Sequence, residues 1–284
     1  MTPTTAPRLR PFTQVDVFTA EPYRGNPLAV VLDAEDLDAD AMQRFANWTN
    51  LSEATFLLPP THPDADYRVR IFTGSEEFPF AGHPTLGSAH AWLEAGGAPL
   101  RDGILVQECA AGLVRVKRDG GRLAFAAPPL TRSGPVAETD LARIAAGLRM
   151  PREALLDASW LVNGPEWIGV LLDSSEQVLA IRPDYAAMAG LKVGVIGPHP
   201  AGSEVGFEVR TFIPGDAAAE DPVTGSFNAG AAQWLIGAGK APESYLAAQG
   251  TMLGRAGRVY IETTGDDVWV GGNSMSCIEG FVLL

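Results

Sequence analysis

Cysteine and long apolar runs are both scarce in this chain. Only two cysteines occur among its 284 residues, Cys109 and Cys277, and they form no spaced framework for disulfides or a metal. No run of about 18 apolar residues exists, so no transmembrane helix is expected. The first eleven residues lack the apolar core of a secretory signal and are expected to be a disordered lead-in. These absences favour a reduced, cytoplasmic protein.

Positive charge and cofactor motifs are scarce as well. Lys and Arg number 21 against 34 Asp and Glu, a net charge of −13, which argues against nucleic acid or an anionic membrane as a partner. The sequence holds no glycine-rich dinucleotide fingerprint, no phosphate-binding loop and no Gly-x-Ser-x-Gly elbow. The four histidines, at positions 62, 83, 90 and 199, are too scattered to predict a metal site. We therefore expect neither a cofactor nor a metal.

What the chain does have is an internal repeat. The hexapeptide His-Pro-Thr-Leu-Gly-Ser at His83–Ser88 recurs as Asp-Pro-Val-Thr-Gly-Ser at Asp221–Ser226, which is 138 residues later (221 − 83). Two tetrapeptide pairs keep the same order at an offset of 140 (209 − 69 and 170 − 30): Val69–Phe72 with Val209–Phe212, and Val30–Asp33 with Val170–Asp173. Three collinear matches predict a duplicated fold with domains 1–128 and 129–284. The last strand, about 276–284, can return to the first domain.

Strand-like segments outnumber helical ones in both halves. Helices are expected at 39–48, 87–95, 140–148, 185–189 and 225–237, of which 87–95 and 225–237 are rich in alanine and predicted to be buried. The remaining apolar segments alternate or end at Gly and Pro turns, as strands do. The predicted fold class is α+β, with two pseudo-symmetric domains, each a mostly antiparallel sheet wrapped around one central helix.

The N-termini of the two alanine-rich helices are the predicted binding elements. Each helix is expected to begin at the Gly-Ser pair of its hexapeptide, where unpaired backbone N–H groups attract carboxylates. His83 and Asp221 stand four residues before these pairs, which makes them candidate acid/base groups. The alternatives are a simple N-cap, a structural histidine and an Asp-Pro turn. The matched positions favour a site.

Glu53 is the third candidate. It leads directly into the apolar segment Ala54–Leu58, where burial would raise the pKa of its carboxyl toward the range of a general base at neutral pH. The alternative is a capping box begun by Ser52, but that box needs Glu or Gln three residues on and Thr55 stands there instead.

Three segments together resemble the signatures of the PhzF-like isomerases of phenazine biosynthesis: Asn50–Phe56, Phe80–Thr85 and Glu220–Ser226. The resemblance covers essentially the whole chain and implies the diaminopimelate-epimerase fold, in which each domain is a curved sheet around its helix and the active site lies between the domains. It further implies a homodimer and a small carboxylate substrate. By this resemblance Glu53 transfers the proton and His83 and Asp221 flank the substrate. The residues that would hold its carboxylate are Gly82, Gly225 and Ser226.

Two departures from related patterns bear on the activity. Phe227 follows Gly-Ser where the family usually has a small residue, and a bulky ring beside the site would affect substrate choice. Related epimerases place cysteines at the positions held here by His83 and Asp221, and neither Cys109 nor Cys277 lies in these motifs. We expect a cofactor-free isomerase that moves a proton within a small unsaturated or amino-carboxylic acid. The alternatives are a cofactor-free epimerase or racemase, and a non-catalytic small-molecule-binding protein.

Overall fold

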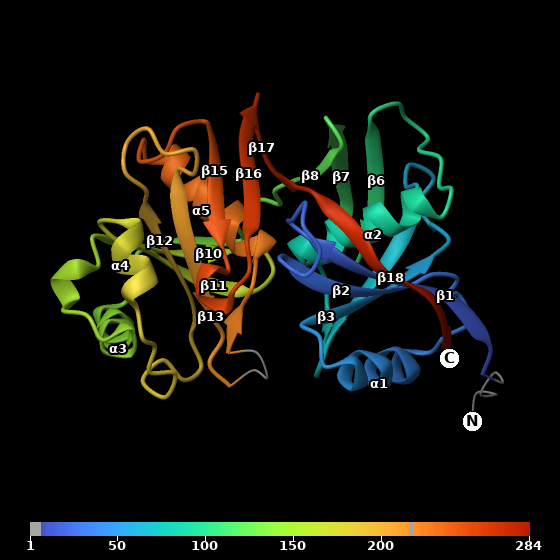
Figure 1. Cartoon of the computed structure of the whole chain (residues 1–284), viewed down its shortest axis with the longest axis horizontal. Helices are drawn as coiled ribbons and strands as arrows, with labels where there is room; N and C mark the ends of the chain where they lie inside the picture. Colours follow the sequence, from blue (N-terminus) through green and yellow to red (C-terminus); the bar gives the residue numbers. More distant parts are fainter. Residues whose placement is uncertain (1–6, 216–218) are drawn as a thin grey trace. The chain divides into compact units, whose positions relative to one another are not determined.

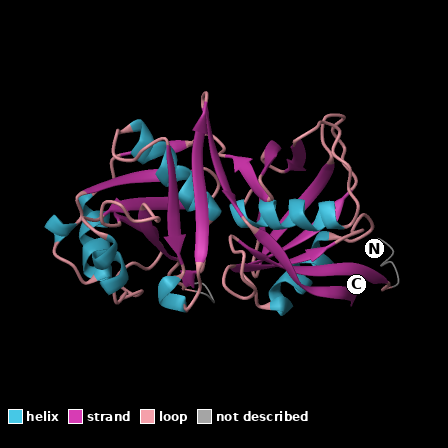
Figure 2. Ribbon diagram, turned by 45° about the horizontal axis from the view of Figure 1, so that its top comes forward, coloured by secondary structure: helices cyan, strands magenta, loops and turns pink. Residues whose placement is uncertain are grey.

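The computed structural model describes residues 7–215 and 219–284, which form two compact units (Figure 1). Unit 1 comprises Met1–Ala126 together with Gly272–Leu284, and unit 2 comprises Ala127–Gly271. Strands dominate both units (Figure 2), so the α+β class holds. Part of the expected N-terminal lead-in, residues 1–6, lies outside the described residues. The rest was predicted wrongly, because a strand begins at Leu9.

Unit 1 is built on one mixed sheet with the strand order β18-β1-β2-β3-β4-β6-β7-β8, and the short β5 also pairs with β4. The β2–β3 and β4–β6 pairs are parallel and the others are antiparallel. Its elements are β1 (Leu9–Val17), β2 (Asn26–Val31), α1 (Ala39–Thr49), β3 (Glu53–Leu58), β4 (Tyr67–Thr73), β5 (Glu77–Phe78), α2 (Gly82–Glu94), β6 (Ile104–Cys109), β7 (Gly112–Asp119), β8 (Arg122–Ala126) and β18 (Ser274–Leu283).

Unit 2 repeats this topology with the order β9-β10-β11-β12-β13-β15-β16-β17, and the short β14 also pairs with β13. Again two pairs are parallel, β11–β12 and β13–β15. Its elements are β9 (Arg132–Gly134), α3 (Glu138–Leu148), β10 (Asp157–Val162), β11 (Glu166–Leu171), α4 (Ser175–Ala180), β12 (Lys192–Pro198), β13 (Phe207–Phe212), β14 (Glu220–Asp221), α5 (Gly225–Gly237), β15 (Ser244–Gln249), β16 (Gly257–Thr264) and β17 (Asp267–Gly272).

Each sheet is packed on both faces. In β2, Ala29 and Val31 belong to a core shared with α1. Leu28 faces the opposite way, because a Cβ added at Gly87 of α2 would lie 2.6 Å from it. In unit 2, helices α3 and α4 share a core with β11, β12 and β13, while α5 contacts β10, β11 and β16. Side chains that alternate along a central strand therefore point alternately toward one helix layer or the other.

Two of the expected helices differ from the structure. Helix α2 starts at Gly82, five residues before the predicted start at Gly87. Residues 185–189 form a turn, and the helix of that region is α4, which begins four residues after Leu171. Its N-cap, Ser174, accepts a hydrogen bond from the backbone N–H of Gln177, which is a capping signal that the sequence contained. No helix among the described residues is long and apolar enough to span a bilayer.

Candidate functional site

Glu53 and His83 meet in unit 1 at the start of two elements. Asn50 ends α1 in the left-handed conformation with φ of 56°, and the chain then enters β3 at Glu53. Ala54 packs toward α1, so Glu53, on the opposite face of the strand, points toward α2. His83 is the second residue of α2, and its Nε2 lies 3.3 Å from Oε2 of Glu53. Their side chains are only 4% and 13% exposed, so this pair lies in a largely dry setting.

The His83 ring is neutral and its proton position is defined by Asn26. Burial lowers the pKa of His83 from 6.5 to about 3. The amide nitrogen of Asn26, which only donates, lies 3.3 Å from Nδ1 of His83. Nδ1 therefore accepts, and the single proton of the neutral ring is on Nε2. The N–H of His83 therefore lies on the side of the ring that contacts Glu53, but the 3.3 Å contact is not aligned as a hydrogen bond.

The turn before β2 positions Asn26. The buried Asp16 carboxylate accepts hydrogen bonds from the backbone N–H groups of Arg24, at 2.8 Å, and Gly25, at 3.1 Å. A Cβ at Gly25 would lie 2.1 Å from the Val17 carbonyl oxygen, so only glycine fits there. Asn26 stands in the segment Gly25-Asn26-Pro27, whose residue types by themselves are typical of a turn. Because the contact with His83 joins residues 57 positions apart, sequence reasoning missed Asn26.

Asp221 lies in unit 2, where it takes part in a buried network of hydrogen bonds. It forms β14 with Glu220 and pairs with Thr211 of β13. Its Oδ2 accepts a short hydrogen bond from the Thr224 hydroxyl. Gln249, at the end of β15, contacts the hydroxyls of Thr211 and Thr224 and the main-chain oxygen of Asp221. No local pattern pointed to Gln249, because it joins the network from another strand.

Gly225 and Ser226 are the first two residues of α5, as Gly82 and His83 are of α2. Ser226 Oγ accepts a hydrogen bond of 3.0 Å from Nε1 of Trp167, and the Asn163 amide donates to the Ser226 carbonyl at 2.9 Å. Since an indole N–H only donates, the Ser226 hydroxyl keeps its own hydrogen for another acceptor.

Phe227 does not project beside the helix start. The ring is fully buried and contacts Trp167 edge to face, with centroids 5.8 Å apart. It fills the space over Gly194, where an added Cβ would lie 2.1 Å from the ring. The expectation of a bulky ring beside the site is therefore wrong, because Gly194 gives this ring a place in the core of the unit.

The two hexapeptides do not occupy equivalent places. Ile71 pairs with Phe78 and Thr211 pairs with Asp221 in the corresponding β4–β5 and β13–β14 ladders. Asp221 thus takes the place of Phe78, and by their positions in α2 and α5 His83 corresponds to Ser226. The tetrapeptide repeat was interpreted correctly, and its arginines pair alike: Arg70 with Glu77 and Arg210 with Glu220, each through two nitrogens. Hence the hexapeptide similarity does not reflect the duplication.

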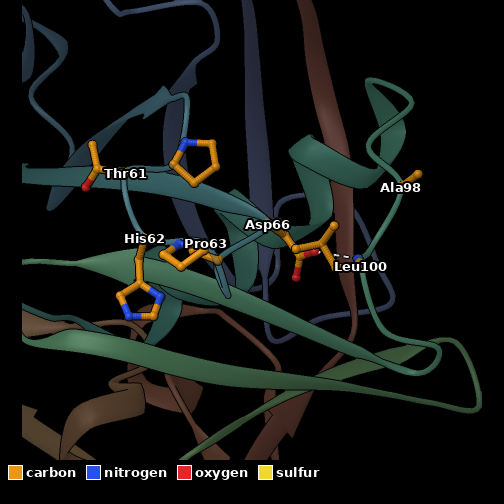
Figure 3. A pocket seen from close by; sticks show the side chains of 8 residues that line it. Thr61, His62, Pro63, Asp66, Ala98 and Leu100 are labelled. Atoms are coloured by element: carbon orange, nitrogen blue, oxygen red, sulfur yellow. Dashed lines mark hydrogen bonds between the residues drawn. The ribbon is translucent and has the colours of Figure 1, made fainter.

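A surface pocket of about 410 Å³ lies elsewhere in unit 1 (Figure 3). Pro60, Thr61, His62 and Asp66 line it together with the segment around Leu100, and Asp66 accepts a hydrogen bond of 2.6 Å from the Leu100 backbone N–H. None of the predicted site residues lines this pocket. It is unrelated to the predicted chemistry.

Groups that bind metals or act as thiol nucleophiles are not gathered at the candidate residues. Within 7–215 and 219–284, no set of three or more His, Cys, Asp or Glu side chains is arranged to hold a metal ion. Cys109 lies on β6 and Cys277 on β18. Burial raises the pKa of the Cys109 thiol, which disfavours the reactive thiolate.

Comparison with known proteins shows which protein family this chain resembles. The family model described as phenazine biosynthesis-like protein matches residues 15–280. The chain belongs to this family. It is 33% identical to trans-2,3-dihydro-3-hydroxyanthranilate isomerase of Pseudomonas aeruginosa, with 95% of this chain and 98% of that protein covered. It is also 36% identical to antisense-enhancing sequence 1 of Schizosaccharomyces pombe, with 95% and 97% covered.

Solved structures agree with this relationship. A phenazine biosynthesis protein of the PhzF family from Enterococcus faecalis superposes with a TM-score of 0.79 at 25% identity, covering 98% of this chain and 100% of that chain. Curated relatives of the chain over nearly its full length are named isomerases. The chain is therefore an isomerase of the phenazine biosynthesis-like family.

Proposed function

We propose that this isomerase moves a proton within a small unsaturated or amino-carboxylic acid without a cofactor, with Glu53 as the proton-transferring carboxylate. The observation that carries the proposal is the buried contact between Glu53 and the neutral ring of His83 at the first turn of α2. The P. aeruginosa relative named trans-2,3-dihydro-3-hydroxyanthranilate isomerase supports the same class of substrate. We further propose that the substrate binds between the two units and that each unit is a curved sheet around its central helix. We also propose that the protein is a cytoplasmic homodimer.

Glu53 takes a proton from a substrate carbon and returns it to another. A carboxylate in a largely dry site is a stronger base than one in water, because burial disfavours its charged form. The negative charge that develops on the substrate needs a hydrogen-bond donor. His83 supplies one through Nε2–H, and as a neutral ring it donates without becoming a competing acid.

The substrate carboxylate binds at helix N-termini. Gly82 and Gly225 are the first residues of α2 and α5, where unpaired N–H groups and the positive end of the helix dipole attract an anion. The Ser226 hydroxyl, whose oxygen already accepts from Trp167, donates its hydrogen to the same carboxylate. Asp221 assists the return of the proton.

Turnover in D₂O tests the proposal. A thermal-shift screen with small carboxylates, including trans-2,3-dihydro-3-hydroxyanthranilate, first selects the probe. We expect solvent deuterium in the product by NMR. Glu53→Gln should lower turnover about 10²- to 10⁴-fold with probe binding nearly unchanged, because the amide keeps the shape but accepts no proton. The matched control is Glu35→Gln at an exposed position. Turnover of Glu53→Gln at the level of this control would remove Glu53 from the mechanism.

A further inference from the structure

The carboxylate of Asp221 ends a chain of two hydroxyl groups. Thr224 Oγ1 forms the short contact with Asp221 Oδ2, and it lies 2.7 Å from Thr211 Oγ1, where either oxygen can be the donor. Thr211 Oγ1 in turn lies 3.5 Å from the main-chain oxygen of Asp221. The chain therefore begins at the side chain of Asp221 and returns to its backbone.

The side-chain amide of Gln249 donates hydrogen bonds to both hydroxyl oxygens. Its Nε2 lies 3.0 Å from Thr211 Oγ1 and 3.0 Å from Thr224 Oγ1. Its Oε1 accepts from the Thr224 backbone N–H, at 3.0 Å, and from the Asn228 amide, at 2.9 Å. Since both groups that face Oε1 are donors, the orientation of the Gln249 amide is fixed. Gln249 thus donates to the two hydroxyls whatever direction their own hydrogens take.

The hydroxyl hydrogens can run in two directions. With Asp221 ionised, Thr211 donates to Thr224 and Thr224 donates to Oδ2. With the proton on Oδ2, Asp221 donates to Thr224, Thr224 donates to Thr211, and Thr211 donates to the main-chain oxygen of Asp221. Only two hydroxyl rotations separate these arrangements, and no heavy atom moves. A buried polar group left unsatisfied is costly, and here neither state of Asp221 leaves one in the chain.

We propose that Thr224 and Thr211, anchored by Gln249, form a reversible hydroxyl relay that keeps Asp221 hydrogen-bonded in both of its protonation states. The three relay residues are positioning residues, since they act through Asp221. The benefit to catalysis rests on the proton-assisting role proposed for Asp221, which gains or loses a proton at little cost in reorganisation. The relay itself is a property of unit 2.

Unit 1 contains a glutamine that corresponds to Gln249, but it lacks the two hydroxyl groups of the relay. Gln107, on β6, donates to Thr85 of α2 at 3.0 Å, much as Gln249 contacts Asn228 of α5. The unit 1 positions that correspond to Asp221, Thr224 and Thr211 are apolar: Phe78, Ala81 and Ile71. The glutamine alone therefore serves to hold the central helix against the sheet. The two hydroxyls occur only in the unit that places a carboxylate there.

The charged groups nearest to Asp221 along the chain are paired with each other. Glu220 binds Arg210 through two contacts of 2.8 Å, and Arg210 also donates to carbonyl groups on the opposite side of β13. Three side chains that reach Asp221, those of Thr211, Gln249 and Thr224, are uncharged. The charged residue Arg255 packs beside the next residue along the chain, because a Cβ added at Gly250 would lie 2.7 Å from the Pro222 carbonyl oxygen and 2.8 Å from Arg255 Cβ. Of these groups the Thr224 hydroxyl contacts the carboxylate itself, so its direction acts directly on the protonation of Asp221.

Two isosteric substitutions should shift the titration of Asp221 in opposite directions. Thr224→Val removes the hydrogen bond to the carboxylate, so the midpoint should rise by about one pH unit. Thr211→Val keeps that bond but removes the acceptor that Thr224 needs when Asp221 is protonated, so the midpoint should fall by about the same amount. The readout is ¹³C NMR of protein labelled in the Asp carboxyl carbons, with the Asp221 signal assigned from its loss in Asp221→Asn. No substrate is needed.

Matched controls separate the relay from a general effect on packing. Thr211→Ser and Thr224→Ser keep the hydroxyls and should keep the midpoint, and they also serve if a valine variant does not fold. Thr85→Val breaks the corresponding contact in unit 1, where the hydroxyl donates to the Ala81 carbonyl, and should leave Asp221 unchanged. Shifts of both valine variants in one direction, no shift, or an Asp221 that never titrates would overturn the relay. Full turnover by Asp221→Asn would instead reject the proposed catalytic role while leaving the NMR result intact.

Discussion

His83 is neutral because it is buried, and this has a consequence for stability. Its pKa lies at about 3 in the folded protein, against 6.5 for an ordinary histidine. Between these two values the unfolded chain binds more protons than the folded one. The contribution of His83 to stability is therefore complete above pH 6.5 and is lost as the pH falls toward 3, by at most about 1.4 kcal/mol for each pH unit.

Replacing His83 should flatten the acid side of the stability profile. We expect the free energy of unfolding of His83→Gln, measured with urea between about pH 4.5 and 7.5, to fall less steeply below pH 6.5 than that of the parent protein. His62→Gln, at an exposed position, is the control and should reproduce the parent profile. Parallel curves for the parent protein and His83→Gln would show that His83 is not held neutral by burial.

Residue types and local context allowed part of the site to be predicted. Glu53 before an apolar strand and His83 four residues before a Gly-Ser pair stood out as candidates, and the structure brings these two side chains together. Asn26, Thr211 and Gln249 could not be found in this way, because each acts through a contact with a residue distant in the sequence. Buried polar side chains of this kind carry no local pattern.

At the level of elements, the starts of α2 and α5 both lack the capping signal that usually marks a helix start in a sequence. Neither N-cap residue, Ala81 or Thr224, caps its helix through a side chain, so the usual signal is missing. Pro84 lies in the first turn of α2, where a proline costs no hydrogen bond, and it was compatible with a start at Gly82. Helix α1 was predicted well, since Asp38 accepts from the Ala41 N–H as an N-cap should.

The start at Gly82 places Gly87 in the interior of α2 and gives it a packing role. A Cβ there would lie 2.6 Å from Leu28 Cδ2 and 3.0 Å from Val17 Cγ2. We expect Gly87→Ala to lower the free energy of unfolding by about 1–2 kcal/mol, because overpacking outweighs the better helix propensity of alanine. Urea titration measures this change.

The control for Gly87→Ala is Gly237→Ala. Gly237 is the exposed last residue of α5, with open space around its missing side chain. This variant should be neutral or slightly more stable than the parent protein. If Gly87→Ala were as stable as Gly237→Ala, the close approach of α2 to β1 and β2 would be relaxed in solution.

At the level of the whole molecule, the proposed function requires both units to act on one substrate. His83 belongs to unit 1 and Asp221 to unit 2. If both groups act in the same proton transfer, the losses of turnover in His83→Ala and Asp221→Ala should not add. We expect the double variant to retain more activity than the product of the two single effects predicts. Steady-state kinetics of the four proteins on the selected probe measure this coupling, and strictly multiplicative losses would indicate independent roles.

The duplication could be predicted from the sequence in outline but not in register. One pair at offset 140 falls on the corresponding strands β4 and β13, and the other falls at the ends of the corresponding strands β2 and β11. The hexapeptides fall on different places because short motifs of His or Asp, Pro and Gly suit turns and helix starts alike. Only the strand ladders, which join Ile71 to Phe78 and Thr211 to Asp221, reveal the true correspondence.

The two units also differ in when all of their strands have been synthesised by the ribosome. Unit 2 is continuous, whereas β18 closes the sheet of unit 1 by pairing with β1 from Leu9 with Leu283 to Val17 with Ser274. Ser274 stands 257 positions after Val17 (274 − 17), and at typical rates of synthesis a segment of that length takes roughly 10–50 s to emerge. During that time one edge of β1 has no partner, and such an edge invites aggregation. A nascent chain therefore can complete its second unit before its first.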